Sequence, residues 1–137
     1  LQAVTHDTTT KVTFGETLWS TVIGDLTNNR AAIKRSGKYR TQVRVSLGSI
    51  ADNTRVQSIA ATGSTPATAG ILNAEFVGFS GATGTIVSTG DETYDLANGD
   101  YVEGWCNWTV SGGSGTKDTQ VGANALKPFL MVVEEMD

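Results

Sequence analysis

Residues 38–47 constrain the fold most, because their side chains change character at every position. The odd-numbered positions hold Tyr39, Thr41, Val43, Val45 and Leu47, whereas the even-numbered positions hold Lys, Arg, Gln, Arg and Ser. Successive side chains of a β-strand point to opposite faces of a sheet. The segment is therefore predicted to be a strand with one buried face and one solvated face.

Other short runs also favour strands, and no stretch of the chain shows a clear helical period. The candidate strands are 12–14, 21–23, 54–61, 74–79, 85–88, 93–96, 101–110 and 126–133. Turns are predicted at 81–84 and, as a tight Asn-Gly hairpin, at 98–99. The 137 residues suffice for one domain with a sizeable core. We expect a single all-β antiparallel sandwich, with residues 1–11 as an extended N-terminal arm.

The closing segment, 126–133, is apolar on both sides of its predicted strand. Phe129, Met131 and Val133 point one way, whereas Leu130 and Val132 point the other. A strand of a small antiparallel sandwich normally buries only one face. The second apolar face therefore predicts contact with another copy of the chain.

Residues 101–110 present a second set of side chains that a core does not require. The predicted core face consists of Val102, Gly104, Cys106, Trp108 and Val110, which leaves Tyr101 and Trp105 on the opposite face. Aromatic side chains with a polar group are enriched at protein interfaces. The predicted subunit interface comprises Tyr101, Trp105, Phe129, Met131 and Val133. A sugar-binding platform is the competing interpretation, because exposed aromatic rings also stack on sugars.

Charge is distributed unevenly along the chain, which carries a formal net charge of −4. Six of the ten Lys and Arg residues lie between positions 30 and 44, and five acidic residues lie between 91 and 103. These clusters are either two solvated surfaces or complementary patches that meet between subunits or against an acidic partner. Lys38, Arg40 and Arg44 form the predicted partner-binding surface. Nucleic acid is disfavoured, because the chain is acidic and the basic stretch has few aromatic residues.

Three short motifs follow one another along most of the chain. They are Gly37-Lys38-Tyr39, then Gly99-Asp100-Tyr101-Val102, and finally the apolar run from Phe129 to Val132. Their order resembles the jelly-roll heads shared by complement-type globular domains and tumour necrosis factor. The amino-acid composition, rich in Thr, Ala and Gly, is most similar to that of phage capsid decoration (cement) proteins and fibre heads. The resemblance implies an antiparallel jelly-roll sandwich that associates as a trimer about a threefold axis.

Few residues point to catalysis, and no enzymatic function is expected. His6 is the only histidine and lies near the start of the sequence, so a Ser-His-Asp or Cys-His arrangement is not expected. Cys106 falls on the predicted core face, where a thiol is usually inert. The acidic residues 91–100 offer oxygen ligands for calcium, but turn formation explains most of them. We expect no metal, no cofactor, no small-molecule ligand and no membrane-spanning segment.

Two functions of different classes are consistent with these observations. The first is a virion structural protein, a trimeric decoration protein that binds the major capsid protein on the outer capsid surface. The alternative is a receptor- or glycan-binding head of a viral fibre, or a secreted lectin-like domain. The second function would use the polar loops expected at 62–70 and 111–122 together with the exposed aromatic residues.

Overall fold

The computed structural model describes residues 2–14, 23–25, 27–50, 54–62, 71–79, 82–89, 92–119 and 128–135. Every regular element in these ranges is a β-strand, so the all-β prediction is confirmed. The strands are β1 (Ala3–Thr5), β2 (Thr10–Lys11), β3 (Ile23–Asp25), β4 (Arg30–Ala32), β5 (Gly37–Ile50), β6 (Thr54–Ala61), β7 (Ile71–Phe79), β8 (Ala82–Ser88), β9 (Glu92–Leu96), β10 (Tyr101–Thr109), β11 (Thr116–Asp118) and β12 (Phe129–Glu134).

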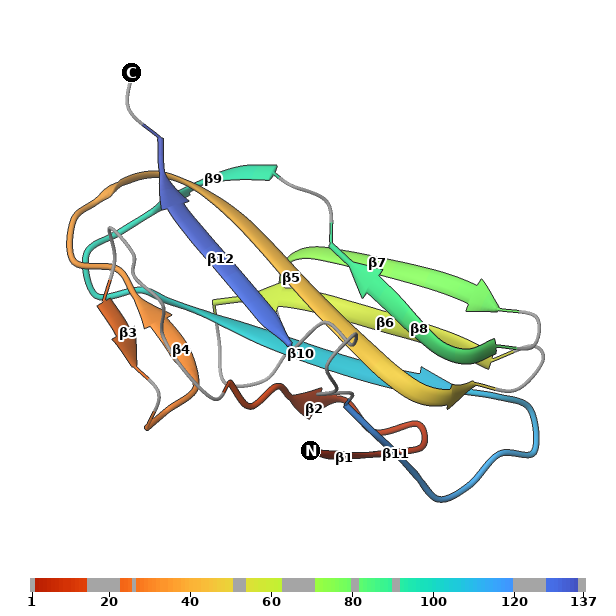
Figure 1. Ribbon diagram of the computed structural model, residues 1–137. Helices are drawn as coiled ribbons and strands as arrows, with labels where there is room; N and C mark the ends of the chain where they lie inside the picture. The colour runs from red at the N-terminus through yellow and green to blue at the C-terminus, as the bar shows by residue number, and fades with distance from the viewer. Residues whose placement is uncertain are drawn as a thin grey trace.

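Two antiparallel sheets form a sandwich-like arrangement (Figure 1). The first, which we call the β10 sheet, has the order β3-β4-β10-β6-β7, with β2 also paired to β10. The second, the β5 sheet, has the order β12-β5-β8, with β9 also paired to β5. A small pair of β1 and β11 completes the described strands. In Figure 1 the long β5 and β12 lie in front of β10 and β6.

The alternation predicted for residues 38–47 is confirmed. The buried set is no more than 1% exposed and comprises Tyr39, Thr41, Val43, Val45 and Leu47. On the outer face, Lys38 is exposed, while Arg40, Gln42 and Arg44 are half-buried. Ser46 differs from the prediction, because it is only 3% exposed. The solvated face of β5 therefore does not continue to Ser46.

The core face predicted for β10 is also confirmed. Val102, Cys106 and Trp108 are buried between the sheets, where they pack on residues of β5 and β6. A Cβ atom at Gly104 would lie 3.1 Å from both Phe14 Cζ and Val43 Cγ1. Glycine thus allows the two sheets to approach closely at the middle of β10.

Residues 2–11 pack against the sandwich rather than extending from it as an arm. Val4 is fully buried in the core, and its carbonyl oxygen accepts a 2.7 Å hydrogen bond from Trp108 Nε1. His6 Nε2 accepts from the Val110 backbone N–H at 3.1 Å, and the imidazole lies edge-on to the Trp108 ring. The N-terminal segment therefore supplies part of the core that covers Trp108.

Several local predictions require correction. The turn at Asn98–Gly99 forms, with Gly99 at a φ of 97°, but it joins β9 of the β5 sheet to β10 of the other sheet, so it is no hairpin. Residues 82–84, predicted as a turn, lie within β8 and pair with β5. Residues 12–14 form no strand, whereas β4 and β11 were not predicted. Residues 116–118, within the loop predicted at 111–122, form β11. Residues 120–122 and most of the loop predicted at 62–70 lie outside the described residues.

Candidate interaction surfaces

The outer face of the β5 sheet brings the closing strand and the basic row together. Directly opposed residues of antiparallel strands share a face, and the register places Met131 across from Gln42 and Val133 across from Arg40. Met131 and Val133 are half-buried. The alternate residues of the strand point inward: Val132 is only 6% exposed, and Leu130 packs on the core. The closing strand thus has an apolar outer stripe beside the arginines.

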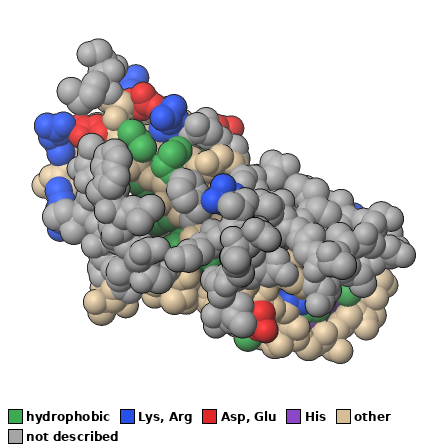
Figure 2. Space-filling model, viewed as in Figure 1, with side chains coloured by type: hydrophobic (Ala, Val, Ile, Leu, Met, Phe, Trp, Pro, Cys, Tyr) green, Lys and Arg blue, Asp and Glu red, His purple; other side chains and the backbone are tan. Residues whose placement is uncertain are grey.

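The predicted partner-binding residues lie along the same face. Lys38 is exposed, Arg40 is 42% exposed at its side chain, and Arg44 stands across from Phe129. The side chain of Phe129 lies outside the described residues. Figure 2 shows apolar side chains flanked by basic and acidic ones over the upper part of this sheet. Met131 and Val133 of the predicted interface therefore share one surface with the predicted partner-binding residues. We call this surface the β5 face: Lys38, Arg40, Gln42, Arg44, Met131 and Val133.

Acidic groups of the same chain adjoin this basic row. The Cα atoms of Lys38 and Asp95 are partners in the pairing of β5 with β9. Arg40 Nε lies 3.4 Å from Glu135 Oε1. The basic and acidic clusters of the sequence thus meet within one subunit, in addition to any contact that they make with a partner.

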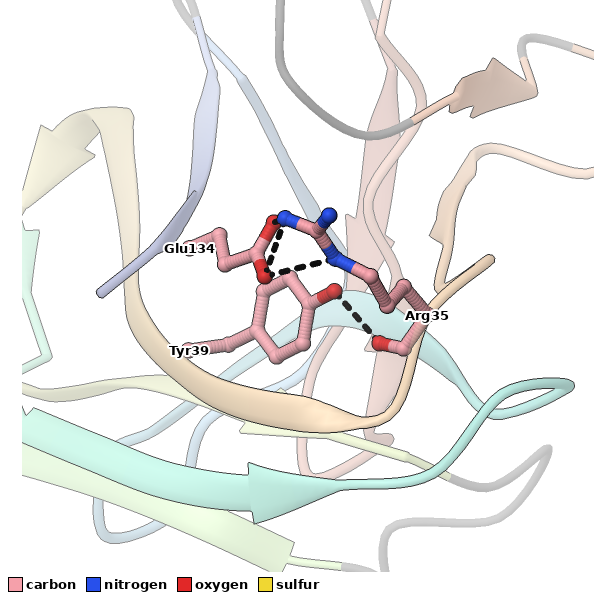
Figure 3. Close-up of polar contacts among 3 residues, drawn as sticks. All are labelled: Arg35, Tyr39 and Glu134. Carbon is pink, nitrogen blue, oxygen red and sulfur yellow. Dashed lines mark hydrogen bonds and ion pairs between the residues drawn. The ribbon is translucent and has the colours of Figure 1, made fainter. Parts of the chain in front are cut away.

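A network of hydrogen bonds links the end of β12 to the segment before β5 (Figure 3). Arg35 Nε and Nη2 donate to Glu134 Oε1 at 3.0 and 2.8 Å, and Nη2 also donates to Oε2 at 2.8 Å. The Tyr39 hydroxyl donates to the Arg35 carbonyl oxygen at 2.6 Å. The bond to Glu134 raises the pKa of the Arg35 guanidinium, and burial raises the pKa of Tyr39. Bidentate pairing of this kind fixes geometry as well as charge.

The outer face of the β10 sheet carries the other predicted interface residues. Tyr101 and Trp105 are half-buried on the face opposite the core, as predicted. The Arg30 guanidinium lies over the Tyr101 ring, 4.3 Å from its centroid, in a cation–π contact. The five residues predicted as one interface therefore lie on the outer faces of two different sheets. The sequence alone does not show this, because alternation within a strand does not reveal which sheet the strand joins.

An ion pair that the sequence did not predict, between a buried glutamate and a half-buried lysine, lies on this second face. Glu103 is 1% exposed, although it shares the outer side of β10 with Tyr101 and Trp105. Its Oε2 atom lies 2.7 Å from Lys11 Nζ. The only signal in the sequence was that Glu103 is the single charged residue of the strand. Its partner is far away in the sequence and comes from β2, which was not predicted as a strand at these residues.

Cys106 and Asp100 are the side chains considered for catalysis or metal binding. The first lies in the core and the second in a turn. Cys106 is fully buried, and desolvation raises the pKa of its thiol to about 12. Asp100 Oδ2 accepts from the Ala97 backbone N–H at 2.8 Å, so this carboxylate caps its own turn. Within the described residues, no three His, Cys, Asp or Glu side chains gather as a metal site. Asp91 lies outside the described residues.

The buried thiol gives a direct test of the core. We expect Cys106 to remain unmodified when the folded protein is treated with iodoacetamide at pH 8, because the thiolate is the reactive form and a pKa near 12 leaves almost none of it. Mass spectrometry before and after unfolding in urea measures the modification. Rapid alkylation without urea would show that β10 opens readily in the folded protein.

Comparison with known proteins supplies no relative for this chain. No protein-family model matches it, and no curated protein is significantly similar in sequence. Among the described residues there is also no helix with the length and apolar character needed to cross a membrane. The function therefore has to be argued from the two surfaces themselves.

Proposed function

We propose that this protein is a virion decoration protein, a trimeric jelly-roll domain that binds the outer surface of a capsid. The observation that carries the proposal is the β5 face, where the half-buried apolar side chains of Met131 and Val133 lie beside a row of cationic ones. The apolar stripe suits burial against another subunit of the trimer. The cationic row beside it is then left for an acidic surface of the capsid. Binding of this kind needs no reactive side chain. This agrees with the position of Cys106 in the core and with the hydrogen bond of His6 to the backbone of Val110.

The sheet orders support the jelly-roll part of the proposal. The chain passes from one sheet to the other at β4–β5, β5–β6, β7–β8 and β9–β10. As a result β10 lies between β4 and β6, and β5 lies between β12 and β8, so neighbours in space are distant in sequence. Such crossovers are typical of Greek-key connections, which a jelly roll uses twice.

Trimer formation follows from the family resemblance together with the outer stripe of β12. Sedimentation equilibrium at micromolar concentration should give three times the mass of one chain. Co-sedimentation with empty capsids of the virus that encodes the protein should then show stoichiometric binding. A monomer at this concentration, or capsids that pellet without the protein, would remove the proposal.

The basic row allows a charge-reversal test of capsid binding. Exchanging both Arg40 and Arg44 for glutamate should weaken binding to an acidic capsid surface, most strongly at low salt. Exposed charges are screened beyond about 8 Å at physiological ionic strength, so the difference from the wild type should shrink as salt rises. Co-sedimentation across a salt series measures the effect, with Arg55→Glu on the other sheet as the control. Equal binding at low salt would leave the row as ordinary solvated surface.

A further inference from the structure

The end of β12 places a carboxylate on the β5 face itself. β12 pairs with β5 up to Glu134. The pairing continues by one residue, because the Glu135 backbone N–H donates to the Lys38 carbonyl oxygen at 2.8 Å. Alternate side chains of a strand share a face, so Glu135 projects on the same side as Val133. The apolar stripe of β12 therefore ends in an acidic side chain beside the basic row.

This carboxylate contacts one of the arginines proposed to bind the partner. Glu135 Oε1 lies 3.4 Å from Arg40 Nε, and both side chains remain open to water, at 39% and 42% exposed. Lys38 has a further acidic neighbour, because its Cα partner in β9 is Asp95. The free protein thus presents its basic row with carboxylates of its own chain at the Lys38 end.

The contact of Glu135 with Arg40 is suited to exchange. Ion pairs between side chains this exposed are weak, because water solvates both charges and salt screens them. The neighbouring pair differs, since Arg35 binds Glu134 through three hydrogen bonds in bidentate geometry. A carboxylate from another protein can therefore replace Glu135 on Arg40 without breaking the contact that holds the end of β12.

We infer that Glu135 holds, in the free protein, the place on Arg40 that a carboxylate of the acidic partner surface takes on binding. The inference rests on the proposed function, because it takes the basic row to be the surface that binds the partner. Like charges repel, so the incoming carboxylate binds fully only after Glu135 has moved away. Glu135 thus lowers the affinity of the basic row for its partner, and the end of β12 acts as a competitor within the chain.

Binding of poly-L-glutamate, an acidic polypeptide, tests the exchange on the whole protein without a capsid. Glu135→Gln removes the charge and keeps the shape of the side chain. It should bind the probe about two- to fivefold more tightly than the wild type, as expected for the loss of one exposed competing ion pair. Asp118→Asn makes the same change in net charge at an exposed position of β11 and should bind like the wild type at physiological ionic strength. Isothermal titration calorimetry measures each affinity.

A double-mutant cycle shows whether Arg40 is the cation concerned. The gain from Glu135→Gln should disappear when Arg40 is also changed to glutamine. Three results would overturn the inference. The first is an equal gain with and without Arg40, the second is a gain of the same size in Asp118→Asn, and the third is the absence of binding in both the wild type and Glu135→Gln.

The NMR signal of the Arg40 Nε–H group gives a second test in the unchanged protein, which does not depend on the folding of any variant. Poly-L-glutamate should shift this signal, and a signal that stays in place contradicts the exchange. The two proposals also fail separately. Capsid binding that Glu135→Gln leaves unchanged would refute only the exchange, whereas the expected gain in a protein that does not bind capsids would refute only the capsid role.

Discussion

Replacing Met131 by glutamate is expected to convert the assembled protein to monomer. Met131 lies on the outer side of β12, half-buried and across from Gln42. In the proposed trimer this side chain is covered by another copy, so the substitution would bury an unpaired carboxylate. Such a burial costs several kcal/mol, and each 1.4 kcal/mol weakens association about tenfold. Association should therefore fall by about two orders of magnitude or more, which sedimentation equilibrium can measure.

A control separates this effect from the general cost of an added charge. Thr116 is exposed on β11, which pairs with β1 and belongs to neither large sheet. Thr116→Glu adds the same charge and should leave the trimer intact. If Met131→Glu and Thr116→Glu both keep the mass of the wild-type assembly, the closing strand is not a subunit contact.

Replacing Lys11 by methionine is expected to destabilise the fold itself. The change removes the cation that lies 2.7 Å from Glu103 Oε2 and leaves a carboxylate that is 1% exposed without its partner. Breaking one side of a buried ion pair typically costs about 3–5 kcal/mol. Because small domains are stable by only about 5–15 kcal/mol, the midpoint of urea unfolding should fall strongly.

The matched variant adds Glu103→Gln to Lys11→Met. It removes the unpaired charge of Glu103 while keeping the shape of the side chain, so it should recover much of the lost stability. A double variant as unstable as Lys11→Met alone would show that the loss comes from the packing of the lysine stem instead. An unfolding midpoint equal to that of the wild type in Lys11→Met would show that the ion pair contributes nothing.

The long strands could be predicted from the sequence because their signal is local. In β5 and β10 the alternation of side chains coincides with burial except at Ser46 and Glu103, and β6 begins and ends at the predicted residues. By contrast, β4 is a three-residue strand, Arg30–Ala32, with no apolar alternation of its own. It is a strand because β10 and β3 pair with it on either side. Pairing of that kind depends on distant residues.

The candidate surfaces were predicted only in part, for the same reason. Turn chemistry at Asn98–Gly99 depends on the backbone of a few residues, and the turn was found. Whether the flanking strands pair with each other depends on the whole fold, and here they enter different sheets. That difference separates Tyr101 and Trp105 from Met131 and Val133. The Lys11–Glu103 pair was missed because it also joins distant parts of the chain.

The position of β12 has a consequence for how the protein is made. Leu130 and Val132 fill the core beside β5, although the two strands are far apart in the sequence. During synthesis, β5 leaves the ribosome long before its neighbour exists, and contacts of such wide separation form slowly. Until β12 arrives, one edge of β5 offers unpaired backbone groups to any strand nearby. Nascent or truncated chains that lack residues 129–134 should therefore require chaperones and be prone to aggregation during translation.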